Sequence, residues 1–405
     1  MTLSAPVLFI LFTVMIDAIG IGLIIPVMPA LIQDITGGSL ANAALWGGIL
    51  SSSFAVMQFL CGPLLGNLSD RFGRRPVLLT SLFVMAICYL IMALASTLWM
   101  LLLARLAAGI TSATQAAAAA YMADTSPPER RGAGFGLVSA ALGLGFVLGP
   151  PLGGLLAEIG PRAPFMAAAF IAVANAVFGF CVLRESLAPE RQRAFDLRRA
   201  NPFGALVQIR ALPGLGRVLM VLLLYQLAFN TYPAIWSFFT IARFDWTPGM
   251  IGLSLAIFGM AMASVQGGLI PLAIARCGET GTVRLGFVFA LITFAILGFL
   301  ENGSLALALL PMAALAAMTV PALQAIASQG TPEDAQGELQ GLFASVAALA
   351  MIAAPVTMTL IFAAFTDESA AFFLPGAPFL AAFGLVLAGL ILFSGKPLVI
   401  ARKAV

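Results

Sequence analysis

The chain contains no histidine among its 405 residues and only four cysteines, at Cys61, Cys88, Cys181 and Cys277. No two cysteines form a C-x-x-C pair, so the ligand spacings typical of zinc sites and haem attachment are missing. Each cysteine lies in or beside an apolar run, where a thiol packs as a small apolar side chain. We therefore expect neither a bound metal nor a cofactor.

Charged residues are also scarce, at 9%, whereas 61% of the residues are hydrophobic. The mean hydropathy of +1.06 is high, and soluble domains carry about 25% charged residues. These values indicate an integral membrane protein that has the lipid bilayer as its partner. The formal net charge of +3 is explained by membrane topology, so no nucleic-acid partner is expected.

Long apolar runs dominate the chain, each about 20 residues or longer, which is enough for a helix to cross roughly 30 Å of hydrocarbon. The runs are continuous rather than alternating, which excludes a transmembrane β-barrel. We predict an all-α polytopic membrane protein with twelve transmembrane helices, at 6–32, 44–68, 74–95, 98–123, 132–157, 163–184, 214–240, 248–274, 282–300, 304–328, 337–365 and 372–396.

The distribution of basic residues predicts the orientation. If both termini are cytoplasmic, only Arg162 and Arg243 fall in external loops and Arg105 lies within a span, which satisfies the positive-inside rule. The first run has no basic segment before it and holds Asp17 and Pro26 in its interior. We therefore expect it to be a retained helix and not a signal peptide.

The two halves of the chain match each other at an offset of 205 residues. This offset pairs Gly73 with Gly278 and Pro150 with Pro355, and it indicates a duplication. We predict six helices in 1–184, a cytoplasmic linker in 185–213 and six helices in 214–405. Parallel six-helix repeats enclose a cavity at mid-membrane and rock to expose it to each side in turn, which is typical of a carrier.

Three motifs stand at the ends of, or within, the spans of the first half. The stretch "GNLSDRFGRRP" (66–76) joins spans two and three, and we expect a short turn anchored by arginines at the cytoplasmic face. "RLAAGITSA" (105–113) places an arginine inside the fourth span, where it needs a carboxylate, carbonyl groups or water, or must reach the outer interface. "GFVLGPPLGG" (145–154) spaces glycines four apart, which lets another backbone approach closely.

These motifs resemble those of the major facilitator superfamily, and the third is similar to the signature of its twelve-helix drug:proton antiporters. With "DAIGIGLIIPVMP" (17–29), "YMADTSPPERR" (121–131) and "VPALQAI" (320–326), the chain resembles the tetracycline:proton antiporters over nearly its whole length. The resemblance implies the major facilitator fold and a proton-coupling role for Arg105. It also implies gating roles for Asp70, Arg71, Arg74, Arg75, Gly145, Gly149, Pro150, Gly153 and Gly154.

The resemblance also implies that Asp17 and Gln58 line the transport path. The chain departs from the tetracycline exporters at Cys88 and Ala290, where they carry membrane carboxylates, and at Met262, where some carry a histidine. These departures weaken the expectation that the substrate is a magnesium–tetracycline cation.

Neutral polar and aromatic groups within the spans either line a substrate cavity or form hydrogen bonds between helices. The densest group is "YQLAFNTYPAIW" (225–236), in which Pro233 can break the helix. We predict a substrate site made by Gln58, Gln115, Tyr225, Gln226, Asn230, Tyr232, Trp236, Gln266 and Gln324.

Asp17 lies near the middle of the first span, where an ionised carboxylate costs at least roughly 3 kcal/mol. We expect Asp17 to hold a proton when it is surrounded by hydrocarbon and to release it to a cytoplasmic cavity. A carboxylate that exchanges its proton for a ligand is sufficient for antiport. A structural aspartate that is hydrogen-bonded to a neighbouring helix is the alternative.

The sequence thus predicts a monomeric inner-membrane exporter of an amphiphilic, drug-like compound, driven by protons. A proton-coupled carrier of a metabolite or organic anion remains the alternative within transport. A membrane enzyme would need groups that are missing here, such as G-x-S-x-G or a histidine. A receptor or scaffold would not need Asp17.

Overall fold

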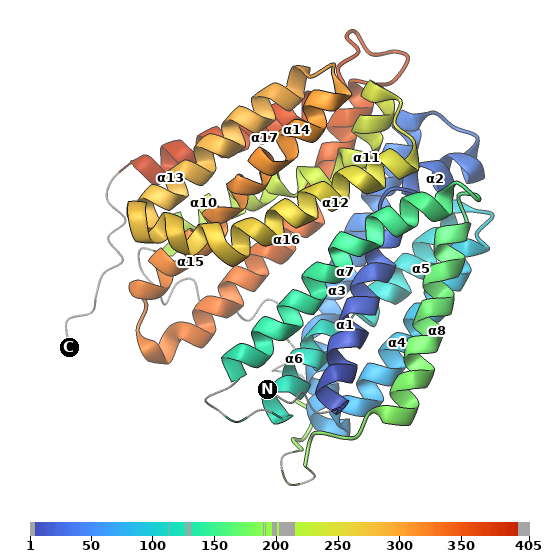
Figure 1. Cartoon of the computed structure of the whole chain (residues 1–405), viewed down its shortest axis with the longest axis vertical. Helices are drawn as coiled ribbons and strands as arrows, with labels where there is room; N and C mark the ends of the chain where they lie inside the picture. The colour runs from blue at the N-terminus through green and yellow to red at the C-terminus, as the bar shows by residue number, and fades with distance from the viewer. Residues whose placement is uncertain are drawn as a thin grey trace. The chain divides into compact units, whose positions relative to one another are not determined.

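A computed structural model describes residues 5–112, 114–125, 127, 131–188, 190, 192–196, 201 and 215–395 (Figure 1). Every regular element in these ranges is helical. The first group comprises α1 (Ala5–Ile24), α2 (Met28–Thr36), α3 (Leu40–Phe72), α4 (Arg74–Ala93), α5 (Leu98–Ile110), α6 (Thr114–Thr125), α7 (Arg131–Ala157) and α8 (Ala163–Val182). The second group comprises α10 (Leu215–Phe229), α11 (Thr231–Phe244), α12 (Pro248–Ser264), η4 (Val265–Leu269), α13 (Ile270–Phe299), α14 (Gly303–Leu315), η5 (Ala316–Met318), α15 (Thr319–Gln329), η6 (Glu333–Ala335), α16 (Gln336–Ala364) and α17 (Ala377–Ser394).

Ten helical stretches of the described residues are long and apolar enough to cross a membrane. One of them, Pro248–Phe299, is 52 residues long and holds two spans, because its backbone leaves the helical region at Gly278. The shorter apolar helix α5 is followed directly by α6, and the two together make one further span. The predicted all-α polytopic fold is therefore confirmed.

Two glycines that the 205-residue offset pairs have the same backbone conformation. Gly73 joins α3 to α4 and has φ 101°. Gly278 lies within α13, where it interrupts the helical backbone, and has φ 67°. Both values lie in the left-handed region, which favours glycine. The short turn expected within 66–76 is a single residue, because α3 continues to Phe72 and α4 begins at Arg74.

Several predicted spans are interrupted, and prolines explain most of the interruptions. A proline ring clashes with the carbonyl group four residues earlier in a helix and provides no N–H donor. A break or an irregular turn of helix lies three or four residues before each of four prolines. These prolines are Pro29 (after the break at 25–27), Pro233 (break at Asn230), Pro271 (π-helix η4) and Pro321 (3₁₀-helix η5). The break predicted at Pro233 is thus present.

At the break between α5 and α6, two side-chain hydroxyl groups bond to backbone carbonyl groups. The hydroxyl of Thr111 donates to the carbonyl of Ala107 at 3.1 Å, and the hydroxyl of Ser112 donates to that of Gly109 at 2.8 Å. Such side-chain bonds compete with the helical backbone ladder. The fourth predicted span, 98–123, is two helices, α5 and α6.

The chain divides into two compact units. Unit 1 contains Met1–Gly38, Ser53–Pro202 and Trp246–Ala256, and unit 2 contains Ser39–Ser52, Phe203–Asp245 and Ile257–Val405. Helices α3 and α12 thus contribute residues to both units. The predicted division of the chain at 184 and 213 stays a prediction, and much of the predicted linker lies outside the described residues.

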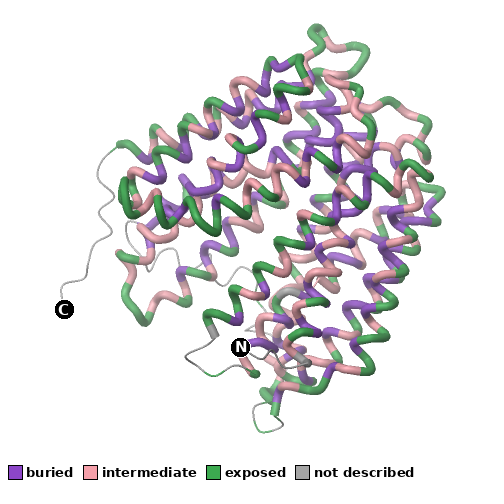
Figure 2. The backbone as a smooth tube through the Cα atoms, viewed as in Figure 1, coloured by how far each residue is buried: buried purple, intermediate pink, exposed green. Residues whose placement is uncertain are grey.

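Along each helix, buried residues recur between exposed ones (Figure 2), so that one face contacts neighbouring helices. The outward faces are strongly apolar, with Trp99, Leu103, Phe170, Phe180 and Ile391 each about two-thirds exposed or more. An apolar exterior of this kind is typical of a surface in contact with lipid.

Candidate functional site

Helix α1 carries Asp17 and packs closely on α7 in unit 1. The glycines of α7 make this approach possible. A Cβ atom built on Gly149 would lie 2.8 Å from the Cα of Gly22 and 2.8 Å from the carbonyl oxygen of Ile19. Gly145 and Gly153 meet the α1 backbone in the same way, at Met15 and at Leu23. Glycines four apart therefore form a seam along α1, as close packing requires.

The same motif contacts a second helix of unit 1. Gly154 lies against the backbone of Pro248 and Gly249, and Gly252 of α12 lies against the carbonyl of Pro150. The predicted gating glycines and Pro150 are thus all at helix–helix contacts within unit 1. Their role in gating stays a prediction.

Another face of α1 carries the polar residues Thr13 and Asp17. Thr13 donates to the amide oxygen of Asn175 in α8 at 3.2 Å, and both side chains are buried. Gly20 lies against the hydroxyl group of Tyr89 in α4. At 100° per residue, Asp17 is about 40° around the helix from Thr13 and about 60° from Gly20. Asp17 is therefore on the face of α1 that is turned toward α4 and α8.

Arg105 of α5 lies in a largely neutral environment. Its guanidinium is 5.8 Å from the centre of the Phe54 ring of α3, and its Nε is buried with no hydrogen-bond partner among the described residues. Its electrostatic neighbours are Tyr89 and Cys88. Within the described ranges no carboxylate pairs with Arg105, in contrast with Arg74, Arg162 and Arg243.

Sequence reasoning missed Tyr89, which interacts electrostatically with both Asp17 and Arg105. Its neighbour Cys88 drew attention only as a departure from the tetracycline exporters. The signal that could have found Tyr89 is a single hydroxyl-bearing aromatic residue in the apolar second half of the third span, "MAICYLIMA".

The remaining predicted site residue of α3, Gln58, is partly buried and lies one turn after Phe54. It is thus near the turn of α3 that contacts Arg105. Gln115 belongs to α6, but its side chain lies outside the described residues.

Three predicted site residues of unit 2 lie in an aromatic cluster. Tyr225, Tyr232 and Trp236 are each 5% exposed or less. Tyr232 has ring contacts with Phe229, Trp236, Phe258, Phe294 and Phe379 at centroid distances of 5.2 to 6.4 Å. The Tyr225 hydroxyl donates to the carbonyl of Ala316 in η5. The Tyr232 hydroxyl is buried and has no hydrogen-bond partner in the part of the chain that the structure describes.

The other predicted residues of unit 2 are more accessible. Gln226, Asn230 and Gln324 are partly buried and Gln266 is exposed in the π-helix η4. The Asn230 amide donates to the carbonyl of Gln226 at 2.8 Å and so belongs to the break between α10 and α11. The structure therefore does not bring all predicted substrate residues of unit 2 to one surface, and their role stays a prediction.

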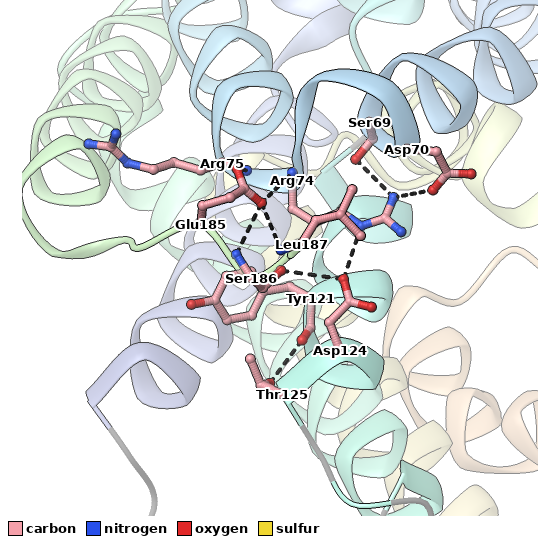
Figure 3. Close-up of polar contacts among 10 residues, drawn as sticks. All are labelled: Ser69, Asp70, Arg74, Arg75, Tyr121, Asp124, Thr125, Glu185, Ser186 and Leu187. Carbon is pink, nitrogen blue, oxygen red and sulfur yellow. Dashed lines mark hydrogen bonds and ion pairs between the residues drawn. The ribbon is translucent and has the colours of Figure 1, made fainter. Parts of the chain in front are cut away.

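At the other end of unit 1, Arg74 is held by two aspartates (Figure 3). Its guanidinium pairs with Asp70 at 2.7 Å and with Asp124 of α6 at 3.2 Å, and it also donates to the Ser69 hydroxyl at 3.1 Å. The pair with Asp124 connects the junction of α3 and α4 to α6. Arg74 is only 12% exposed, so solvent screens these pairs less than typical surface pairs.

Glu185, just after α8, caps the start of α4 (Figure 3). Its carboxylate accepts from the backbone N–H groups of Arg74 at 2.8 Å and Arg75 at 3.1 Å, and also from those of Ser186 and Leu187 at 3.0 Å. A carboxylate at a helix N-terminus satisfies free donors and favours the helix dipole. The carboxylate lies so close to Gly73 that a Cβ there would collide with it.

The other two arginines of this junction point elsewhere. Arg75 donates to the carbonyl of Phe180 at 2.9 Å, with its guanidinium 5.5 Å from the centre of the Phe180 ring. Arg71 is exposed and lies over the ring of Phe72. Of the predicted gating residues here, Asp70 and Arg74 thus form an ion pair and Arg71 does not join it.

We expect Glu185→Gln to destabilise unit 1. The amide NH₂ of glutamine cannot accept the bond from Arg75, and the negative charge at the start of α4 is lost, which together cost about 1 kcal/mol. The measurement is the midpoint of thermal unfolding of the purified protein. Glu190→Gln is the control, because Glu190 has no hydrogen bond or ion pair within the described ranges. Equal midpoints for the two variants would remove the capping role.

The first residues of the predicted linker lie over this junction. The Arg193 N–H donates to the carbonyl of Asp70 at 3.1 Å, and the Asn67 amide donates to the carbonyl of Asp196 at 2.6 Å. A cavity of about 480 Å³ lies at this junction. It is lined by Asp70, Arg74, Asp124, Leu187, Glu190, Gln192 and Arg193. In the described part of the chain no group of three acidic, cysteine or histidine residues could hold a metal ion.

Comparison with known proteins decides the family. A model of the Major Facilitator Superfamily matches residues 10–355. The chain belongs to the major facilitator superfamily. It is thus a member of a family of transporters and not an enzyme, and its twelve-span helical architecture is the fold of that family.

Two relatives within the superfamily are tetracycline resistance proteins of Escherichia coli. The chain is 42% identical to the class C protein over 355 residues, which cover 88% of this chain and 89% of the relative. It is 36% identical to the class B protein over 349 residues, 86% of each chain. The resemblance to tetracycline exporters that the motifs predicted is confirmed.

A solved superfamily structure is also similar. The crystal structure of the human organic anion transporter MFSD10 (TETRAN) matches with a TM-score of 0.70 and 25% identity, covering 97% of this chain and 100% of that one. The similarity thus extends over both groups of helices.

Proposed function

We propose that this protein is a proton-driven antiporter of a bacterial inner membrane that exports an amphiphilic, drug-like compound by alternating access. The observation that carries the proposal is Asp17, a carboxylate in the interior of α1 that has no ion pair within the described ranges. An ionised carboxylate costs free energy when hydrocarbon surrounds it and little when water reaches it. Opening a water-filled cavity beside Asp17 would therefore favour release of its proton. The relationship to tetracycline resistance proteins supports export.

The glycine seam supports the alternating-access part of this proposal. It ties α1, and hence Asp17, closely to α7, and α7 in turn contacts the start of α12. A movement of α7 would therefore carry α1 with it. We propose that both termini are cytoplasmic, that the halves 1–184 and 214–405 move as the two repeats, and that the chain acts as a monomer.

We propose that Gln58, which lies near Arg105 in unit 1, contacts the substrate. Within unit 2 we propose the same role for Gln226, Asn230, Gln266 and Gln324. Tyr225, Tyr232 and Trp236, the other predicted substrate residues of unit 2, are buried in its aromatic cluster. Aromatic side chains with a few polar groups suit an amphiphilic ligand.

A growth-inhibition panel tests the proposal. A pump-deficient bacterial host that expresses the chain is exposed to diverse antibiotics, with tetracyclines included, beside a host with an empty vector. We expect resistance to at least one amphiphilic compound, and loss of that resistance when a protonophore removes the proton gradient. Equal sensitivity of the two hosts to every compound would contradict drug export.

An organic anion carrier is the second candidate, and one feature of the site favours it. Arg105 is positively charged inside a span and has no carboxylate partner within the described ranges. The related human structure is that of an organic anion transporter. The two candidates are distinguished by the uptake of two dyes into inside-out vesicles, the anion fluorescein and the cation rhodamine 123, which share a xanthene body. Uptake of fluorescein alone would favour the organic anion carrier.

A further inference from the structure

Tyr89 is buried in α4, 3% exposed, with its hydroxyl group against α1. A Cβ atom built on Gly20 would lie 3.0 Å from the hydroxyl oxygen and 3.2 Å from a ring carbon of Tyr89. Any side chain at position 20 would therefore press on the hydroxyl group. Gly20 leaves the space that lets Tyr89 reach the α1 backbone.

The hydroxyl group is on the same side of α1 as Asp17. Gly20 follows Asp17 by three residues, so the two positions are neighbours on adjacent turns. The hydrogen bond between Thr13 and Asn175 marks the same face one turn earlier. The titratable or charged groups that interact with Tyr89 are Asp17, Arg105 and Cys88.

Tyr89 also interacts with Arg105, whose Nε is buried and unpartnered. Asp17 and Arg105 form no ion pair with each other. Among the described side chains, Tyr89 thus interacts with both charged groups inside the spans of unit 1. A phenol can donate one hydrogen bond and accept others at the same time.

We propose that Tyr89 is a positioning residue of the proton-coupling site, which donates a hydrogen bond to the ionised carboxylate of Asp17 and accepts one from the guanidinium of Arg105. This inference rests on the proposed proton-driven function. The hydroxyl group of Tyr89 stays protonated throughout, so Tyr89 neither gives up nor takes up a proton. The bridge stabilises the charged form of Asp17 and fixes its direction on α1.

The test is Tyr89→Phe in purified protein reconstituted in lipid, because phenylalanine keeps the ring and removes only the hydroxyl group. Infrared difference spectra are recorded as pH is varied, and the carboxylic acid band that Asp17→Asn removes is assigned to Asp17. We expect the midpoint of this band to move about one pH unit higher in Tyr89→Phe, since a lost hydrogen bond to the charged form makes ionisation harder. No substrate is needed.

Two further variants separate positioning from packing. Tyr121→Phe removes a hydroxyl from another buried tyrosine of unit 1, in α6, and should leave the midpoint unchanged. Gly20→Ala keeps both Tyr89 and Asp17 but displaces the hydroxyl, and it should shift the midpoint in the same direction as Tyr89→Phe. An unchanged midpoint in Tyr89→Phe would overturn the inference, whatever the result for Gly20→Ala.

The outcome is independent of whether the protein exports drugs. If wild-type protein shows no transport that depends on the pH gradient, but Tyr89→Phe and Gly20→Ala raise the midpoint of the Asp17 band, the proposed function fails and the bridge stands. In the opposite case, wild-type transport depends on pH, and Tyr89→Phe matches wild type both in the pH dependence of transport and in the midpoint of the Asp17 band. The proposed function then stands and the bridge is wrong.

Discussion

Replacing Asp17 with asparagine is expected to abolish proton-driven export while the protein remains folded. Asparagine has nearly the same volume as aspartate, so the packing of α1 on α7 through the glycine seam is kept. It cannot release a proton at physiological pH, so the exchange of a proton for substrate is lost. What remains is at most downhill exchange that does not respond to pH.

The measurement uses proteoliposomes with an imposed pH gradient and the compound to which the growth panel shows resistance. Asp34→Asn is the matched control, because Asp34 lies at the end of the short helix α2 and pairs with Arg162 at 3.2 Å in an exposed position. Such a pair contributes about 0–1 kcal/mol, so transport should be normal. An Asp17→Asn protein that still concentrates substrate with normal pH dependence would show that another group carries the proton.

Features that follow from local sequence rules were predictable. Glycines four apart on an apolar helix indicate close packing whatever the partner, and Gly145, Gly149 and Gly153 form such a contact. A proline acts on the carbonyl four residues before it, so the break near Pro233 follows from the chain itself. The arginine distribution and the apolar runs depend only on the bilayer, which is the same for every membrane protein.

Contacts between distant residues were not predictable in the same way. Glu185 lies more than a hundred residues after Arg74, and its carboxylate has no local pattern that distinguishes it from the other charges of the linker. Tyr89 reaches Gly20 only because α4 and α1 meet α8 in common, which is a property of helix packing. Sequence reasoning therefore found the charged members of the site, Asp17 and Arg105, but not the residue that interacts with both.

The aromatic residues of the second half show a different difficulty. Tyr225, Tyr232 and Trp236 are amphipathic, so they suit either a ligand cavity or a helix interface. In unit 2 the rings pack on Phe258, Phe287, Phe294 and Phe379. Composition alone cannot distinguish the two environments, because both are apolar with a few hydrogen-bonding groups.

Replacing Gly149 with alanine is expected to be strongly disruptive even though it adds a single methyl group. The added Cβ would lie 2.8 Å from both the Gly22 Cα and the Ile19 carbonyl oxygen, which are backbone atoms that cannot move aside as a flexible side chain could. Relief requires α1 and α7 to separate, and overpacking of this kind costs about 1–3 kcal/mol. Because α1 carries Asp17, we expect both a lower midpoint of thermal unfolding and a loss of most proton-driven transport.

Gly143→Ala isolates the cause, since Gly143 lies on the same helix with no atom within 4 Å of a Cβ built there. Both substitutions replace glycine with alanine, which favours the helix by up to about 1 kcal/mol. The difference between the unfolding midpoints of the two variants therefore measures the contact with α1. Gly143→Ala should therefore be neutral or slightly stabilising and transport normally. If Gly149→Ala unfolds at the same temperature as Gly143→Ala and transports equally well, α1 and α7 are not held together by the glycine seam, and a movement of α7 would not carry Asp17 with it.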